Sequence, residues 1–299
     1  MTRRASYSGH VTFMRRPAAT DFSAADVVVA GLPFDVATTN APGARFGPRA
    51  IRAQSLQLAW GPIWPWGFDP FQRLTVVDAG DIEWDWGRPR GMAAAATAHT
   101  REVLASGARP LTLGGDHYAT LPLLRAVAER HGPVALIHFD AHRDTEPGGG
   151  EGRLDHGIVF AEALRERLIV EEASVQIGIR TCYDGEAGAG MTVIDAAAAH
   201  AMTPERVAER IRAVVDGRPC YLTFDIDCLD PAFAPGTGTP VPGGLSSHQA
   251  RAILWGLKGM PIVGADVMEV SPPLDPSGIT ALAAAMLAVD VCCLWAAGA

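Results

Sequence analysis

The stretch VALIHFDAHRDT, from Val134 to Thr145, joins an apolar run directly to two histidines and two aspartates. The run is apolar at almost every position up to Asp140, which is typical of a strand buried on both faces of a parallel sheet. Side chains alternate faces along an extended chain. If this geometry persists past the strand, Asp140, His142 and Asp144 point to one side. The stretch therefore predicts a parallel α/β sheet with a polar site at the end of this strand.

Short β-branched segments of the same kind recur along the chain and alternate with Ala-rich segments. The expected strands are residues 27–32, 74–79, 109–114, 134–140, 174–180, 191–195, 220–225 and 262–269. The expected helices are residues 48–58, 92–105, 121–130, 204–215, 246–257 and 279–294. This alternation predicts a three-layer α/β fold, in which helices cover both faces of a central, mostly parallel sheet of about eight strands. Because one pattern runs throughout, we expect a single domain, 1–299, with an N-terminal arm at 1–20.

The charge balance and the cysteines limit the class of protein. The chain has 299 residues, with 25 basic and 33 acidic side chains and a net charge of −8. This acidic balance argues against nucleic acid or an anionic membrane as a partner. We also expect no segment that is apolar enough to span a bilayer. The five cysteines are odd in number and lack the spacing of a metal ribbon, which indicates a reduced, cytoplasmic protein.

Acidic and imidazole side chains stand at the carboxyl ends of four expected strands. The motifs are GGDH from Gly114, DAHRD from Asp140, DIDCLD from Asp225 and the glutamate of VMEVSP, Glu269. Ligands of open α/β sheets bind at this edge. So many converging carboxylates repel one another unless a cation compensates them. The set suits two divalent ions, and its oxygen-rich, thiolate-free character favours Mn²⁺ over zinc, with zinc or cobalt as substitutes.

Some of these groups also have a purely structural interpretation. Asp116 stands where an N-cap of the helix from Leu121 would lie. His138 lies inside its strand, where a satisfied core histidine is expected rather than a ligand. A single His-x-Asp pair is usually a cap or a surface feature. Three strand ends of this composition are not explained in that way, so a metal site is the preferred interpretation.

Longer motifs resemble the ureohydrolase family of arginases and agmatinases. They are GGDH from Gly114, HFDAHRDT from His138, DHG from Asp155, FDIDCLDPAFAPGTGTPVPGGL from Phe224, DVMEVSP from Asp266 and ITAL from Ile279. The resemblance covers essentially the whole chain, and it implies the arginase-like form of the three-layer fold. The segments WPWGFDPFQRLTVVDAGD from Trp64 and QIGIRT from Gln176 are similar to bacterial agmatinases in particular.

The resemblance implies a hydrolase that converts the guanidino group of agmatine into urea and releases putrescine. Its cofactor would be two Mn²⁺ per subunit, and its nucleophile a hydroxide that bridges them. One ion would be bound by His117, Asp140, Asp144 and Asp225, and the other by Asp140, His142, Asp225 and Asp227. The catalytic residues would be Glu269 as carboxylate partner of the guanidinium, Asp144 as proton donor to the leaving amine, and His156 as a proton shuttle near the mouth.

Two features depart from the agmatinase pattern. Arg143 occupies a position that is usually Thr or Ser in agmatinases. By alternation it points away from the metals, so we expect little effect on the chemistry. The loop from Glu146 to Leu154 looks longer and richer in glycine than usual, and we expect it to line the entrance.

Substrate choice stays open on the sequence alone. Glu146, Glu151 and Asp155 would suit the distal amine of agmatine, whereas Arg153 would suit a carboxylate-bearing compound such as 4-guanidinobutyrate. Guanidinopropionate and arginine are further alternatives within the family. A catalytically silent, metal-binding assembly paralogue is the alternative outside enzymes. The resemblance also implies a homo-oligomer, either a trimer or a hexamer.

Overall fold

One parallel sheet organises the chain, and the computed structural model describes residues 5–147, 152–182 and 187–298. The strands are β1 (Val27–Gly31), β2 (Val76–Asp81), β3 (Arg109–Leu113), β4 (Ala135–Phe139), β5 (Val175–Ile177), β6 (Thr192–Ile194), β7 (Cys220–Asp225) and β8 (Ile262–Met268). They lie in the order β2-β1-β3-β8-β7-β4-β5-β6. All eight predicted strands are confirmed. The sheet, expected to be mostly parallel, is parallel at each neighbouring pair of these strands.

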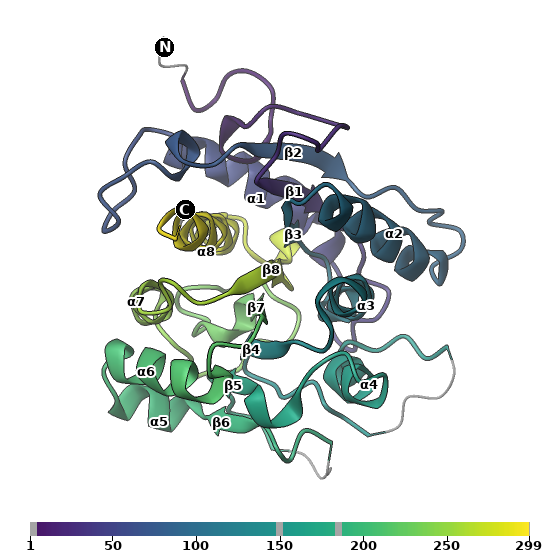
Figure 1. Cartoon of the computed structure of the whole chain (residues 1–299), viewed down its shortest axis with the longest axis vertical. Coiled ribbons are helices and arrows are strands. Elements are labelled where there is room, and N and C mark those ends of the chain that lie inside the picture. Colours follow the sequence, from purple (N-terminus) through teal and green to yellow (C-terminus); the bar gives the residue numbers. More distant parts are fainter. Residues whose placement is uncertain (1–4, 148–151, 183–186, 299) are drawn as a thin grey trace.

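Helices cover both faces of the sheet, which confirms the predicted three-layer fold (Figure 1). They are α1 (Gly47–Ser55), α2 (Gly91–Ala105), α3 (Thr120–His131), α4 (Val159–Arg165), α5 (Ala196–Ala201), α6 (Pro204–Val215), α7 (Ser247–Trp255) and α8 (Ile279–Ala296). In Figure 1, α2, α3 and α4 lie on one face, and α5 to α8 lie on the other together with α1. The sequence did not predict α4 and α5, because helices of 7 and 6 residues are too short to show a helical period.

The sheet divides the apolar core into two layers. In β4, Ala135, Ile137 and Phe139 pack into the cluster that includes α8, whereas Leu136 packs into the cluster that includes α3. Both faces are therefore covered, which explains why this strand is apolar at nearly every position. His138 shares the side of Leu136, and its ring lies close to α4.

Helix α8 corrects one expectation from the sequence. It is apolar enough by composition to cross a membrane, with a mean hydropathy of 2.0 over 18 residues, although we expected no such segment. In the structure, 78% of this window is buried inside the protein. Within it, Asp290 accepts hydrogen bonds from the Trp66 indole at 2.8 Å and the Arg251 guanidinium at 2.7 Å. Helix α8 is therefore a core helix, and its apolar composition serves packing.

Part of the expected N-terminal arm packs against its own chain. Phe13 and Met14 are fully buried, and the backbone N–H of Phe13 donates to Asp78 Oδ2 at 2.7 Å. The same carboxylate is paired with Arg52 at 2.9 Å. Because Asp78 lies in β2 and Arg52 in α1, this buried ion pair anchors the arm to both elements.

Candidate metal centre

Polar side chains lie at one edge of the sheet, where four neighbouring strands end: β3, β8, β7 and β4. The residues at or just beyond their carboxyl ends are His117, Glu269, Asp225 and Asp140. Parallel strands end at a common edge, so residues from distant parts of the sequence meet there.

Turns, rather than extended chain, bring the remaining acidic and imidazole groups to this edge. Strand β4 ends at Phe139, and Asp144 has a left-handed φ of 50°. The N–H of His142 donates to Asp140 Oδ1 at 2.6 Å, and the N–H of Asp227 donates to Asp225 Oδ1 at 2.7 Å. Hydrogen bonds from an aspartate to the backbone two residues on are typical of Asx turns. The expected extended geometry is therefore wrong, although the expected side chains do meet.

The Nδ1 atom of His117 faces three carboxylates at once. It lies 3.1 Å from Asp140 Oδ2, 3.1 Å from Asp144 Oδ2 and 3.2 Å from Asp225 Oδ2. The ring is fully buried, yet Nδ1 makes no hydrogen bond of good geometry with any described residue. Buried polar atoms normally have a partner. A nitrogen that faces three oxygens without such a bond is the arrangement expected of ligands around a cation.

A second group of the same kind shares Asp140. The Nδ1 atom of His142 lies 3.0 Å from Asp227 Oδ2 and 3.4 Å from Asp140 Oδ1. Asp140 thus presents one oxygen to His117 and the other to His142. Asp140, His142 and Asp227 have ligand atoms within 4.8 Å of one another, as a metal ion would require.

Electrostatics also fits a cationic occupant. Burial raises the pKa of Asp225 well above its usual value, and the nearby carboxylates of Asp227 and Asp140 raise it further. Burial and Asp140 raise the pKa of Asp227 to about 6. The ion-pair partners of these acids in the described part of the chain are histidines. A pair of divalent ions would relieve this repulsion, so the residues present fit the metal centre that the motifs imply.

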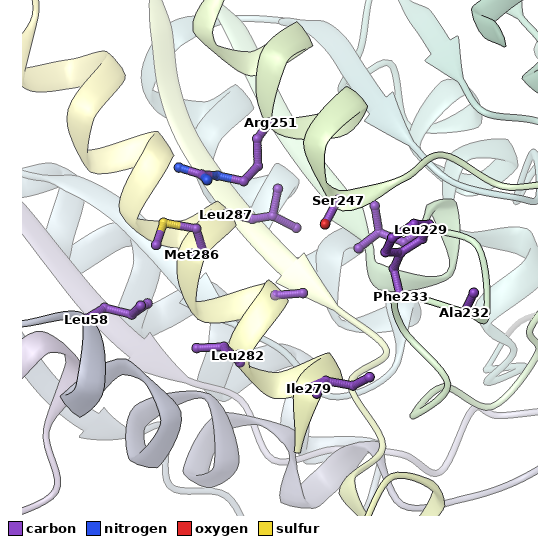
Figure 2. Close-up of a pocket in the computed structure, with 11 residues that line it drawn as sticks. Leu58, Leu229, Ala232, Phe233, Ser247, Arg251, Ile279, Leu282, Met286 and Leu287 are labelled. Atoms are coloured by element: carbon purple, nitrogen blue, oxygen red, sulfur yellow. The ribbon is translucent and has the colours of Figure 1, made fainter. Parts of the chain in front are cut away.

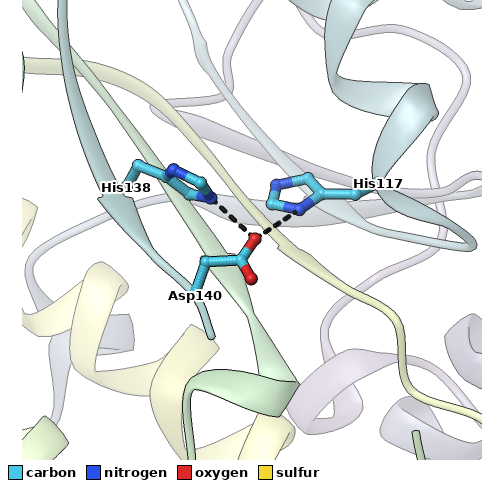
Figure 3. A group of neighbouring side chains, drawn as sticks. All are labelled: His117, His138 and Asp140. Atoms are coloured by element: carbon cyan, nitrogen blue, oxygen red, sulfur yellow. Dashed lines mark hydrogen bonds and ion pairs between the residues drawn. The ribbon is translucent and has the colours of Figure 1, made fainter. Parts of the chain in front are cut away.

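His138 lies beside these groups, but its ring is not free to bind a metal ion (Figure 3). It can share an ion with His117 and Asp140 by distance alone. However, its Nε2 is hydrogen bonded to Asp140 Oδ2 at 2.7 Å, and its Nδ1 to the Gln176 amide at 3.1 Å. Both ring nitrogens are therefore used, as expected of a satisfied core histidine.

Asp116 does not act as the helix cap that was its structural alternative. It precedes the 3-10 turn His117–Ala119, but its side chain makes no capping hydrogen bond there. Its Oδ2 instead accepts from the N–H of Ala37 at 2.8 Å, and the group is fully buried. Asp116 therefore ties the loop at Ala37 to the floor of the site.

Glu269 and His156 form a buried pair next to the metal ligands. Glu269 Oε1 lies 2.7 Å from His156 Nδ1 and accepts from the N–H of His117 at 2.9 Å. The other ring nitrogen of His156 lies 2.8 Å from Thr39 Oγ1. Burial opposes the charged form of His156, but the bond to Glu269 outweighs it, and the net effect raises its pKa to about 9. The pair can hold a proton on His156 at neutral pH.

A cavity of about 230 Å³ opens above this cluster. Its walls include Thr39, His142, Arg143, Asp144, Glu146, Asp155, His156, Gly157, Thr181, Cys182, Asp225 and Thr239. The predicted site residues thus lie together around one cavity or, like Glu269, directly behind its wall. Sequence reasoning missed Thr39, Thr181, Cys182 and Thr239, because a threonine or a cysteine in a loop carries no pattern of its own.

The entrance residues are placed only in part. Glu146 and Asp155 line the cavity, and Arg153 is paired with Asp155. Glu151 lies outside the described residues. Arg143 is among the residues that line this cavity, and its guanidinium donates to Gln176 Oε1 at 2.9 Å and to the carbonyl of Gly188 at 2.6 Å.

Comparison with known proteins places this architecture in a family. A family model described as the arginase family matches residues 25–293. The chain belongs to the arginase family. The agmatinase of Chromobacterium violaceum is 49% identical over 290 residues, which are 97% of this chain and 89% of that protein.

Two solved structures of this arginase-family type are close in both sequence and shape. A hypothetical agmatinase from Burkholderia thailandensis is 54% identical with a TM-score of 0.95, covering 98% of this chain and 92% of that one. The proclavaminate amidino hydrolase from Streptomyces clavuligerus is 41% identical with a TM-score of 0.92, covering 99% of this chain and 100% of that one. The predicted arginase-like fold is therefore confirmed.

Membership of the arginase family indicates that the protein is a hydrolase acting on guanidino compounds. The family depends on a binuclear metal centre, and His/Asp groups able to hold metal ions are present here.

A second hollow of about 350 Å³ lies between α7, α8 and the segment around Phe233 (Figure 2). Its lining is mainly apolar, and its one arginine, Arg251, is paired with Asp290. None of the described residues that line it is an aspartate, glutamate or histidine, whereas the cavity at the strand ends is lined by all three types.

Proposed function

We propose that this protein hydrolyses agmatine to urea and putrescine with two Mn²⁺ ions per subunit. The observation that carries the proposal is the position of His117 Nδ1 among three buried carboxylates, beside a second group built on His142, at the floor of one cavity. The names of the agmatinase relatives support the choice of substrate.

The proposed metal ligands are His117, Asp140, His142, Asp144, Asp225 and Asp227. Asp140 and Asp225 would contribute to both ions. The carboxylate-rich donor set, without thiolate, supports Mn²⁺ among the divalent metals. When bound, the ions would neutralise the acidic cluster and make hydroxide available from water near neutral pH.

The remaining residues would bind the substrate and move protons. We assign the guanidinium to the carboxylate of Glu269, which matches a planar cation and lies directly behind His156. As the guanidinium takes this carboxylate, His156 is released from it and can carry a proton between the cavity and solvent. Asp144, on the wall of the cavity, would pass a proton to the leaving amine.

The charges at the mouth favour a substrate with a cationic tail. Glu146 lines the cavity and is exposed, so its carboxylate is available to an ammonium group. Arg153 is already paired with Asp155. Agmatine carries a positive charge at each end, one of which would meet Glu269 and the other Glu146.

The test is a substrate panel on the Mn²⁺-loaded enzyme, with urea as the readout. We expect urea from agmatine at a rate at least tenfold above that from 4-guanidinobutyrate, guanidinopropionate or arginine. Glu146→Gln should raise the KM for agmatine while leaving the KM for uncharged-tail guanidines, such as butylguanidine, unchanged. Urea from none of these compounds, with metal bound, would refute the assignment and revive the silent metal-binding paralogue.

A second candidate substrate is 4-guanidinobutyrate, and one observation favours it. Arg143 lines the cavity, where its positive charge would attract a carboxylate. Two further contacts weigh against this role, because its guanidinium already donates to Gln176 Oε1 at 2.9 Å and to the carbonyl of Gly188 at 2.6 Å. Faster urea release from 4-guanidinobutyrate than from agmatine would make it the preferred substrate.

We also propose that the enzyme is a cytoplasmic homo-oligomer, a trimer or a hexamer. All five cysteines are free thiols, which suits a reducing compartment. Light scattering coupled to gel filtration would measure the mass, and a monomer in solution would contradict the proposal.

A further inference from the structure

A row of buried polar side chains crosses the sheet just below the metal ligands. Register pairs Gln176 in β5 with His138 in β4, His138 with Thr223 in β7, and Thr223 with Asp266 in β8. All four are fully buried. Because side chains in register on parallel strands share a face, these four form one continuous line. His138 and Thr223 each lie two residues before a proposed ligand, Asp140 and Asp225.

One end of this row is tied to Arg143. Its Nε donates to Gln176 Oε1 at 2.9 Å, and its own carbonyl accepts from Gln176 Nε2 at 2.7 Å. An arginine side chain can only donate hydrogen bonds. The amide oxygen of Gln176 must therefore face Arg143, and the amide nitrogen must face away from the guanidinium, toward His138 at 3.1 Å.

This orientation fixes the hydrogen positions on His138. The amide nitrogen of Gln176 has hydrogens and no free acceptor site, so His138 Nδ1 accepts from it. A ring nitrogen that accepts carries no hydrogen, so the hydrogen of His138 sits on Nε2, which lies 2.7 Å from Asp140 Oδ2. The chain of bonds thus runs from Arg143 through Gln176 and His138 to a carboxylate oxygen that also faces His117 at 3.1 Å.

We propose that Arg143, Gln176 and His138 are positioning residues that hold Asp140 in its metal-binding orientation. The inference rests on the proposed role of Asp140 as a ligand. Arg143 touches neither substrate nor ion in this role. It acts by fixing the amide of Gln176, which in turn fixes the tautomer of His138. Under this proposal Arg143 would affect metal binding, contrary to the expectation that it has little effect on the chemistry.

The proposal and simple electrostatics predict opposite changes in Mn²⁺ affinity when the Arg143 side chain is removed. A nearby positive charge repels metal ions, so its removal alone would tighten Mn²⁺ binding. Loss of the relay would weaken Mn²⁺ binding, because partners that orient a metal ligand are typically worth about 10–100-fold in affinity. Arg143 acts through two intermediates, so we expect the low end of this range, about tenfold.

The experiment titrates the full-length, metal-stripped protein with Mn²⁺ by calorimetry at a temperature below the unfolding of every variant. Arg143→Met should raise the Mn²⁺ dissociation constant about tenfold, and His138→Leu should raise it at least as much. Arg153→Met is the matched control, since it removes a positive charge at the same entrance but lies outside the relay; it should not raise the constant. His138→Gln, which keeps a donor near Asp140, should recover part of the loss.

An unchanged or lower dissociation constant for Arg143→Met would overturn the proposal. A fall in the melting temperature of the metal-free variant with unchanged Mn²⁺ affinity would do the same, because it would indicate a structural role only. Failure of the proposed function gives a different result. Wild-type protein that binds Mn²⁺ but yields no urea would refute the substrate, whereas wild-type protein that binds no Mn²⁺ would refute the ligand assignment itself.

Discussion

His156 Nδ1 lies 2.7 Å from Glu269 Oε1, although 113 positions separate the two residues in the chain. The pair stands between the cavity, which His156 lines, and the strand end that carries Glu269. A carboxylate in this position both orients the imidazole and is available to an incoming cation.

Replacing Glu269 should therefore impair substrate binding and proton transfer together. Glu269→Gln keeps the shape but removes the charge, and hydrogen bonds to charged groups are worth about 1.5–3 kcal/mol. We expect kcat/KM for the guanidino substrate to fall roughly 10–100-fold. Glu129→Gln, at an exposed ion pair remote from the cavity, is the control. Steady-state urea kinetics measures the effect, and an unchanged kcat/KM would contradict the assigned role.

The same pair should make the stability of the metal-free protein depend on pH. The ordinary pKa of His156 is 6.5, and the bond to Glu269 raises it in the folded state to about 9 despite burial. The pair therefore stabilises the fold fully below about pH 6.5, and this contribution disappears as the pH rises through about 9. At full strength it amounts to on the order of 3 kcal/mol. Urea unfolding of wild type and His156→Asn at pH 6 and pH 10 should show a difference that shrinks at the higher pH; an equal difference at both would refute it.

Metal removal should abolish activity and lower stability. Incubation with a chelator, followed by gel filtration, should leave no urea production, and added Mn²⁺ should restore it. Because ions bind the folded state, a concentration of 100 times the dissociation constant stabilises by about 2.7 kcal/mol. Thermal unfolding with and without Mn²⁺ measures this shift. In Asp225→Asn the Mn²⁺-dependent shift should be much reduced, and a shift of wild-type size would exclude Asp225 as a ligand.

Loss of Asp78 should destabilise the protein and detach the arm segment around Phe13. The carboxylate accepts from Phe13 N–H and from the guanidinium of Arg52, which is itself buried. Breaking a buried pair by removing one partner typically costs about 3–5 kcal/mol. We expect Asp78→Ala to lower the free energy of unfolding by this amount and to speed proteolysis near Phe13. Asp21→Ala, which removes an exposed carboxylate bonded only locally to Ser23 N–H, should change stability by less than about 0.5 kcal/mol.

The sequence predicted much of the fold because burial leaves a strong pattern. Strands β1, β4 and β7 are buried along their whole length, so their apolar runs were visible from the sequence alone. The long helices were found for a similar reason. The local geometry of the ligands was not predicted, because Asx turns at Asp140 and Asp225 replace the extended chain. Helix α8 is apolar enough to pass the composition test for a membrane span although 78% of its window is buried, since composition alone does not distinguish a core helix from a membrane span.

The sequence by itself determined which ionisable groups stand at the strand ends, since every parallel strand must finish at the same edge of the sheet. Only the tertiary structure decided how these groups face one another. Strand order placed β4 between β5 and β7, and this adjacency put Gln176 and Thr223 on either side of His138. A hydrogen bond between side chains depends on distance and direction in space. The hydrogen bond between Arg143 and Gln176, which are 33 positions apart, is therefore seen only in the folded structure.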